Sequence, residues 1–429
     1  MIGKVLDMRI LILRHIEKNS MDDIYDTTDY LKYEYIKSTN VGNKLWLLGL
    51  VSTISTPNNQ IDFLESYMDV DYINANYDIC IKPEANIFSS RFIDGMKSHV
   101  EKYKNVKIPI YVIACGASAK SYDELDELCQ AIKEPATEFI KSVYKTGGEF
   151  CLRGYFTKEM FDRFGFHDAV VTGCPSLYQR GRNLNIADKK VTRDEFKPAL
   201  NGSIDLVKRP LKDYKKSEFF DQGLFYPILY QGYEGEIKKY IDIYGLKSVN
   251  LIDEDRLNLL IDMQDWANYL IGNDFNFSCG SRIHGNIMPI LCGIPAVISP
   301  PDSRVREMAE FFDIPMITKS SIIEEDLYEI YLDTNYEKFN QSFAKKYDAY
   351  EAFLKERGIV EKLNNNSLLQ TSASEIDFER LGYIQAVKCK NENREILERI
   401  SSKHLLWEVY EKKRRSIIKA VEKTNLFKK

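Results

Sequence analysis

Arg282 and His284 stand two residues apart at the start of a long apolar run. In an extended segment alternate side chains turn to the same side, so this spacing predicts that the two face one way and Ile283 faces the other. A guanidinium is a good partner for phosphate or carboxylate, and an imidazole is a good proton donor near neutral pH. The pair therefore predicts an anion site with an acid beside it.

The residues around this pair predict a strand, a short loop, a helix and a second strand. Gly285 and Asn286 are expected to open the helix, and residues 296–299 to form the buried strand that follows it. Ligands of such units bind at the carboxyl ends of strands, near the helix amino terminus. We therefore expect His284 to be catalytic, with Arg282, Gly285 and Asn286 binding the ligand. The alternatives are a structural histidine and an arginine paired with a neighbouring carboxylate.

Two further arginines follow predicted strands. Arg304 comes after the strand at 296–299, where Ser303 could cap the next helix, and Arg153 precedes Thr157, which could cap another. A cation at a helix start opposes the helix dipole, so an arginine there favours an anionic partner. Both arginines are candidates for the same ligand, Arg153 from the first domain. A solvated first turn is the other explanation for Arg304.

Motifs for several other chemistries do not occur in the sequence. It contains no GxxxxGK[ST], no GxGxxG after the first strand and no HExxH. Two Asp-x-Asp pairs, at 69–71 and 253–255, have a spacing that could hold a divalent metal, although the second could equally cap a helix. We expect no metal site and no Ser/His/Asp nucleophile.

Apolar runs and helical patterns alternate along most of the chain, which predicts an α/β fold. In the first half we expect strands at 33–36, 77–81, 108–115, 150–152 and 169–172, with helices at 43–54 and 122–132. In the second half we expect strands at 227–231, 248–252, 275–279, 296–299 and 316–318, with helices at 234–244, 256–270 and 305–312.

Residues 180–222 are polar and have little periodicity, which predicts a linker or irregular crossing. We therefore expect two Rossmann-like doubly wound domains with a cleft between them, and a helical, charged C-terminal extension. The predicted boundaries are 1–195, 196–225 for the linker, 226–320 and 321–429.

Several first-half strands end at glycine or at small polar residues, which let a ligand or a helix approach the backbone closely. These positions are candidates for an acceptor site or for the lining of the cleft: Asn40, Gly42, Asn43, Gly116, Gly173 and Ser176. Since glycine also simply ends strands, each match alone is weak.

The composition excludes several classes of protein. Hydrophobic residues make up 44% of the 429 residues, and no stretch approaches the roughly 20 apolar residues of a membrane span. The first apolar stretch is broken by charges, which argues against a signal peptide. Eight cysteines form no CxxC pair, as expected in a reducing cytoplasm. A net charge of −5 gives no case for nucleic acid.

The last segment of the chain differs in charge from the rest. Residues 402–429 contain nine Lys/Arg and three Asp/Glu. Apolar residues between 404 and 426 recur at near-helical spacing, interrupted for one turn at 411–415. This basic amphipathic helix either packs on its own domain or makes peripheral contact with an anionic membrane surface.

Four segments of the sequence resemble the polysaccharide pyruvyltransferase family. They are Arg282-Ile283-His284-Gly285, Gly173-Cys174-Pro175-Ser176, Arg153-Gly154 and Asn40-Val41-Gly42-Asn43. The resemblance covers roughly residues 38–320. It implies two Rossmann-like domains arranged as in GT-B glycosyltransferases, and transfer of pyruvate from phosphoenolpyruvate to a glycan or lipid-linked sugar as a ketal.

The resemblance also assigns roles to individual residues. The family's donor-binding arginines and its histidine fall on Arg153, Arg282 and His284, and Arg304 stands where the family commonly has a lysine. Phosphoenolpyruvate would be a co-substrate, and the reaction requires no other cofactor. Two alternatives remain: a nucleotide-sugar-dependent glycosyltransferase of the same build, and a non-catalytic partner in glycan assembly.

Overall fold

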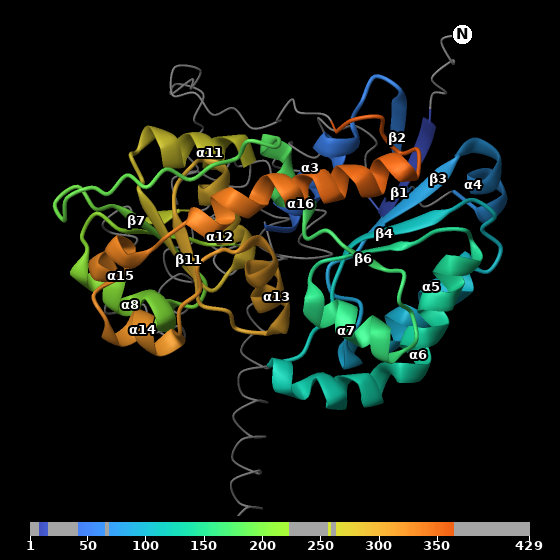
Figure 1. Cartoon of the computed structure of the whole chain (residues 1–429), viewed down its shortest axis with the longest axis horizontal. Coiled ribbons are helices and arrows are strands. Elements are labelled where there is room, and N and C mark those ends of the chain that lie inside the picture. Colours follow the sequence, from blue (N-terminus) through green and yellow to red (C-terminus); the bar gives the residue numbers. More distant parts are fainter. Residues whose placement is uncertain (1–7, 16–41, 65–67, 223–255, 259–262, 364–429) are drawn as a thin grey trace, which may run out of the picture.

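The computed structural model describes residues 8–15, 42–64, 68–222, 256–258 and 263–363, and these contain two β-sheets (Figure 1). The strand order is β2-β1-β3-β4-β5-β6 in the first sheet and β11-β10-β7-β8-β9 in the second. Each described pairing is parallel. Helices connect the strands, so the predicted fold of two Rossmann-like α/β units is confirmed.

The first unit contains six strands and the helices that cover them. The strands are β1 Met8–His15, β2 Asn59–Leu64, β3 Ile79–Pro83, β4 Ile110–Cys115, β5 Phe150–Leu152 and β6 Val170–Val171. The helices are α3 Gly42–Ile54, α4 Val70–Asn76, α5 Ile93–Tyr103, α6 Leu125–Lys145 and α7 Tyr155–Arg163, followed by the 3-10 helix η3 Pro175–Arg180. All six residues of β4 are buried, as expected of a central parallel strand covered on both faces.

The second unit is smaller and carries the helix of His284. Its strands are β7 Pro198–Asn201, β8 Glu218–Phe220, β9 Leu257–Asn258, β10 Phe277–Gly280 and β11 Ala296–Ile298. Its helices are α8 Ile204–Asp213, α11 Met263–Gly272, α12 Ile283–Leu291 and α13 Ser303–Phe312.

In the described part of the chain three helices follow the second sheet, and the last of these joins the two units. They are α14 Lys319–Glu324, α15 Leu327–Asp333 and α16 Glu337–Glu356. Just before α16, the Tyr336 hydroxyl donates to the carbonyl of Ala296 in β11 at 2.8 Å. Toward its other end, the hydroxyls of Tyr350 and Thr53 of α3 lie 3.2 Å apart. Helix α16 therefore runs from the second unit back to the first (Figure 1).

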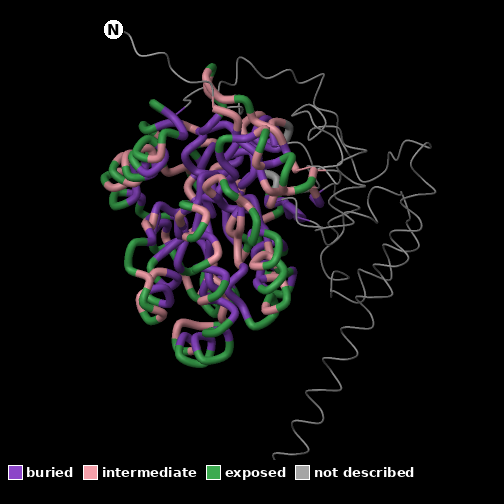
Figure 2. Tube along the Cα trace, turned by 90° about the vertical axis from the view of Figure 1, so that its right-hand side faces the viewer, coloured by how far each residue is buried: buried purple, intermediate pink, exposed green. Residues whose placement is uncertain are grey.

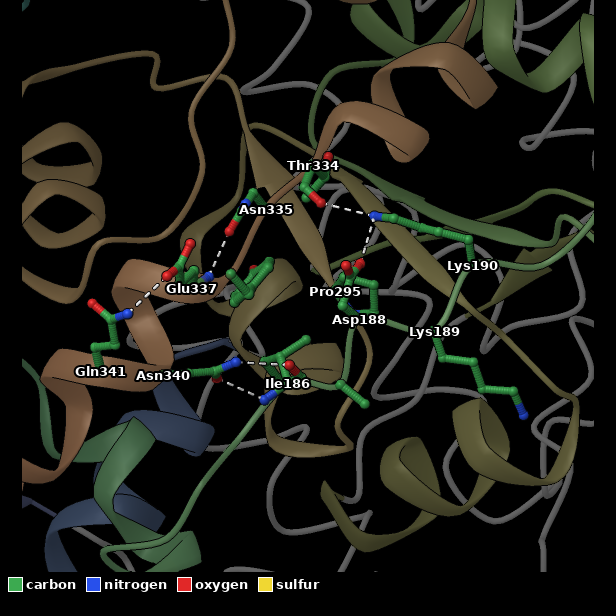
Figure 3. Close-up of a pocket in the computed structure, with 12 residues that line it drawn as sticks. Ile186, Asp188, Lys189, Lys190, Pro295, Thr334, Asn335, Glu337, Asn340 and Gln341 are labelled. Atoms are coloured by element: carbon green, nitrogen blue, oxygen red, sulfur yellow. Dashed lines mark hydrogen bonds and ion pairs between the residues drawn. The ribbon is translucent and has the colours of Figure 1, made fainter.

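The hydrophobic core is continuous between the two units. One cluster of buried side chains includes residues of both sheets together with α3, α12, α13 and α16. A second cluster lies between the first sheet and the helices α5, α6 and α7. Figure 2 shows buried segments through the middle of the molecule and exposed ones around its edge. No disulfide joins the described cysteines, and most of them are buried, as small hydrophobic residues are.

The structure differs from the sequence analysis in four places. Strands β1 and β2 were not expected. Residues 198–220 form β7, α8 and β8 instead of a linker, because short apolar groups between the polar residues suffice for strands of three or four residues. Residues 257–258, at the start of the helix expected at 256–270, form β9, and Met263–Gly272 form α11. Residues 316–318 make a single bridge, between Met316 and Ile298.

The remaining predictions concern segments outside the described residues. These are the strands expected at 33–36, 227–231 and 248–252, the helix expected at 234–244, and the basic segment at 402–429. The domain boundaries proposed from the sequence also stay predictions.

Candidate functional site

Helix α12 begins one residue after Arg282, which is its N-cap. The extended segment expected here, with Arg282 and His284 on one face, is therefore wrong. The Arg282 side chain is exposed, whereas His284 is only 7% exposed. The helix starts early because Asn201, at the end of β7, accepts a hydrogen bond from the Arg282 N–H at 3.0 Å and so fixes the turn.

Asn286 supports this turn from inside the helix. Its Nδ2 donates to the Arg282 carbonyl at 2.8 Å, and its Oδ1 accepts from the Ser278 hydroxyl at 2.9 Å and from Asn201 Nδ2 at 3.2 Å. The side chain is fully buried. These bonds occupy the amide within the protein, so Asn286 holds the helix start in place and does not face a ligand as predicted.

Gly285 packs against the same residues. A Cβ at this position would lie 2.8 Å from Asn201 Cγ and closer still to the side-chain nitrogen of Gln222. The close approach requires glycine, which explains Gly285 through packing. Gln222 is itself buried, and its Nε2 has no hydrogen-bond partner among the described residues.

Arg153 lies in the first unit, directly after β5, and is only 4% exposed. Its N–H donates to the Cys115 carbonyl at 2.8 Å, which ties it to the end of β4. Ala114 there has a left-handed backbone (φ 60°) at a register shift in the strand pairing, and this turns the chain toward Arg153. Neither Nε nor Nη2 of Arg153 has a hydrogen-bond partner in the described part of the chain.

Arg153 and His284 act on each other although they come from different units. Burial lowers the pKa of His284 to about 3, and the nearby charge of Arg153 contributes to this shift. The imidazole Nε2 is buried without a hydrogen-bond partner among the described residues. Two basic side chains with free donor or acceptor atoms therefore lie together at the amino terminus of α12, where the helix dipole also favours an anion.

A third ionisable residue, Glu307 of α13, completes the group. Its carboxylate accepts from the Thr157 N–H at 3.0 Å and from the Thr157 hydroxyl at 2.9 Å, and that hydroxyl accepts from the Ala117 N–H at 2.8 Å. Thr157 was predicted to cap α7, but α7 begins at Tyr155. Thr157 instead donates hydrogen bonds to Glu307 of the other unit. Burial raises the pKa of Glu307 to about 8, against the opposing effects of Thr157 and Arg153.

Arg304 does not join this group. Asp302 caps α13, where Ser303 was expected to do so, and Arg304 Nη2 pairs with the Asp302 carboxylate at 2.6 Å. The Ser303 hydroxyl instead accepts from the Ala119 N–H at 2.9 Å and so joins α13 to the loop after β4. The first turn of α13 is thus an interface between the two units.

The other candidates differ in what surrounds them. A Cβ at Gly116 would lie 3.6 Å from Arg153 Cδ, so this position is at the site. Gly173 packs against the rings of Phe311 and Phe312, and the fully buried Ser176 donates to Cys174 Sγ at 3.1 Å, so packing accounts for both. Gly42 and Asn43 start α3, which packs against α12, and Asn40 lies outside the described residues.

Glu307 is the main residue that sequence reasoning missed. Ser303, Glu307 and Phe311 recur every four residues on one buried face of α13. An acid within such a face is the signal that could have identified it, since carboxylates are almost never fully buried unless paired.

No group of three His, Cys, Asp or Glu residues that could hold a metal occurs among the described residues. Asp69, of the first Asp-x-Asp pair, caps α4 by accepting from the Tyr72 N–H at 2.7 Å. Within the same part of the chain, no helix is both long and apolar enough to cross a membrane.

Comparison with known proteins identifies the family. The sequence profile of polysaccharide pyruvyl transferases matches residues 12–303, more than half of the chain and the part that contains Arg153 and His284. The chain belongs to the polysaccharide pyruvyl transferase family. It is accordingly a transferase that modifies glycans. No curated protein matches the sequence.

Several solved structures are similar to the chain at low identity and low TM-score. S. aureus MnaA, in a co-structure with UDP, is 8% identical with a TM-score of 0.41, and the match covers 83% of this chain and 98% of that one. The glycosyltransferase SnogD from Streptomyces nogalater is 10% identical with a TM-score of 0.28, over 80% and 95% of the two chains. Neither likeness decides the reaction.

Proposed function

We propose that this transferase moves the pyruvyl group of phosphoenolpyruvate onto a glycan or lipid-linked sugar, where it closes as a cyclic ketal. The observation that carries the proposal is the pairing of Arg153 and His284, both buried, with side-chain nitrogens that have no partner among the described residues. A buried guanidinium favours an anionic partner. Phosphoenolpyruvate supplies a phosphate and a carboxylate, which suit arginine and a helix amino terminus.

The reaction proceeds in two balanced steps. First the methylene carbon of phosphoenolpyruvate takes a proton, C2 gains cationic character, and an acceptor hydroxyl forms a bond to C2. Then a second hydroxyl of the acceptor bonds to C2 while phosphate leaves with the bonding electron pair. The acceptor loses two hydroxyl protons, of which one balances the proton on carbon and the other accompanies phosphate. No cofactor takes part.

His284 is the candidate acid for the first step, although its lowered pKa keeps it neutral in the free protein at pH 7. Burial is the main cause of the low pKa, and the charge of Arg153 adds to it; an anion bound to Arg153 offsets the second effect, and its own negative charge favours the imidazolium. Donor binding should therefore raise the pKa of His284 and supply it with the proton that the methylene carbon needs. The free enzyme avoids an unpaired imidazolium, and the acid forms with the donor in place.

The test combines phosphoenolpyruvate with a panel of glycan and lipid-linked sugar acceptors and measures phosphate release and the ketal mass. Arg153→Gln should weaken donor binding roughly tenfold or more, and His284→Asn should lower kcat roughly 10² to 10⁴-fold with donor binding nearly retained. Arg209→Gln is the matched control and should behave as wild type, because the Arg209 side chain lies on the exposed face of α8.

The same panel separates the alternatives. Turnover of a nucleotide sugar with no consumption of phosphoenolpyruvate would establish the glycosyltransferase. If neither donor is consumed with any acceptor, the protein is a partner in glycan assembly and the proposed reaction is wrong.

The proposed reaction takes place in the cytoplasm, at the inner face of a membrane that carries lipid-linked acceptors. The support is the basic segment at 402–429, which lies outside the described residues. Full-length protein should co-sediment with vesicles of anionic lipid at low salt, and a chain ending at Lys403 should not, while both turn over a soluble acceptor equally. Equal sedimentation of the two proteins would exclude this role.

A further inference from the structure

Glu307 connects the second unit to the helix that follows Arg153. The first N–H groups of α7 need acceptors, and its N-cap, Gly154, has no side chain to provide one. The Glu307 carboxylate accepts from the Thr157 N–H and hydroxyl across the interface between the units. The start of α7, and with it the segment that carries Arg153, is therefore held by a side chain of α13.

Glu307 and Arg153 are close without forming an ion pair. The position of a Cβ at Gly116 lies 3.1 Å from Glu307 Oε1 and 3.6 Å from Arg153 Cδ, so both groups border one glycine. A Cβ at Gly154 would lie 2.8 Å from Glu307 Cβ. The Glu307 carboxylate accepts its hydrogen bonds from Thr157 and not from Arg153. The guanidinium of Arg153 can therefore bind a ligand, and its Nε and Nη2 have no partner among the described residues.

The charges around Glu307 determine whether binding of an anion at Arg153 raises or lowers the pKa of Glu307. Arg153 faces it from the end of β5, Glu310 from the same helix, Cys115 from the end of β4, and Tyr122 from the 3-10 turn before α6. Of these, Arg153 stabilises the carboxylate and Glu310 disfavours it. An anion bound to Arg153 would reduce the stabilising effect, so Glu307 would hold a proton more tightly in the complex.

We propose that Glu307 is a positioning residue of the anion site, which holds Arg153 in place from the opposite unit and takes up a proton from solvent when an anion binds. The proposal rests on the anion-binding part of the proposed function and adds a regulation by pH to it. Because Glu307 has a pKa of about 8 in the free protein, anion affinity should be greatest below pH 8 and should fall as the pH rises further.

The experiment is calorimetry of the full chain with phosphoenolpyruvate, and separately with inorganic phosphate, at pH 8 in two buffers of different ionisation enthalpy. Glu307 should contribute at most about half a proton per anion bound in wild type, since it is about half protonated at pH 8. Glu307→Gln should take up fewer protons by that amount, and its affinity should fall less than that of wild type between pH 7 and 9. Glu310→Gln, one turn along α13, is the matched control: it should keep the proton uptake of Glu307, shifted to slightly lower pH because Glu310 disfavours the Glu307 carboxylate.

A structural role alone would lower affinity at every pH and leave proton uptake unchanged, so equal uptake by wild type and Glu307→Gln overturns the proposal. If Glu307→Gln does not fold, Thr157→Val provides the second test. Loss of its hydroxyl removes bonds to the carboxylate, so the pH at which affinity falls should rise, and an unchanged pH overturns the proposal.

The result also separates this inference from the donor assignment. Proton uptake linked to Glu307 with inorganic phosphate, but no consumption of phosphoenolpyruvate, would support Glu307 and reject the donor. Ketal formation, with the same proton uptake in Glu307→Gln as in wild type, would support phosphoenolpyruvate as donor and reject the role of Glu307. If no anion binds, the inference is wrong.

Discussion

The stability of the free protein should depend on pH through buried groups of opposite kind, which are the histidines His284 and His99 on one side and the acid Glu307 on the other. The pKa of His284 falls from 6.5 to about 3 on folding, so the unfolded chain binds its proton more tightly and stability is lost as the pH falls below 6.5. The pKa of Glu307 rises from 4.5 to about 8, so the folded chain binds its proton more tightly and stability is lost as the pH rises from 4.5 to 8. Between pH 4.5 and 6.5 the two effects oppose each other.

The change in stability above pH 6.5 reports on Glu307 alone. Each pH unit over which one proton differs between the folded and unfolded states changes the free energy of unfolding by about 1.4 kcal/mol. His284 is already neutral in both states above pH 6.5, so Glu307 alone should remove about 2 kcal/mol between pH 6.5 and 8. Its carboxyl group is 1% exposed, so solvent screening reduces this little.

The assay is chemical denaturation of wild type, Glu307→Gln and Glu310→Gln at intervals from pH 5 to 8.5. Wild type and Glu310→Gln should both lose stability toward pH 8, and Glu307→Gln should lose about 2 kcal/mol less over the same range. The difference in slope is the readout, because glutamine also alters the bonds to Thr157 and changes the stability at every pH. Parallel profiles for all three proteins would show that Glu307 is ionised in the folded state and would refute the reasoning.

Two further predictions concern the start of α12. Asn286→Ala removes a buried amide that bonds to Arg282, Ser278 and Asn201, so it should lower the free energy of unfolding by about 2 to 3 kcal/mol, measured by denaturation at pH 7. Arg282→Ala should leave stability unchanged because its side chain is exposed, but it should weaken binding of phosphoenolpyruvate about tenfold by calorimetry; unchanged affinity would remove Arg282 from the donor site.

The fold was predictable where apolar runs were long and uninterrupted. Strands β4, β10 and β11 are buried throughout, and the apolar runs in their sequences indicate this. Strand β1 was not predicted because Arg9 and Arg14 shorten its apolar run to four residues. Strands β7 and β8 have four and three residues, too few for a period to be visible within a lysine-rich segment.

The site was predictable in part for a related reason. Arg153 and His284 were predicted because a basic residue between a strand pattern and a helix pattern can be recognised from the sequence alone. Their proximity was an expectation that depended on both units folding. The prediction that Arg282 and His284 share one face was wrong. The backbone N–H of Arg282 donates to Asn201, which is distant in sequence, and α12 therefore starts earlier than the local residues indicate. Glu307 was missed because an acid on a helix normally faces solvent.

The contacts between the units explain why the site needs both of them. Arg153 comes from the first unit and His284 from the second, and both are buried. The bonds that hold the interface, from Glu307 to Thr157 and from Ala119 to Ser303, lie beside these two residues. Separation of the units would expose Arg153 and His284 to water and remove the effect of each on the other. The low pKa of His284, the raised pKa of Glu307 and the affinity for an anion are therefore properties of one docked arrangement, and any change that loosens α13 from α7 should alter all three together.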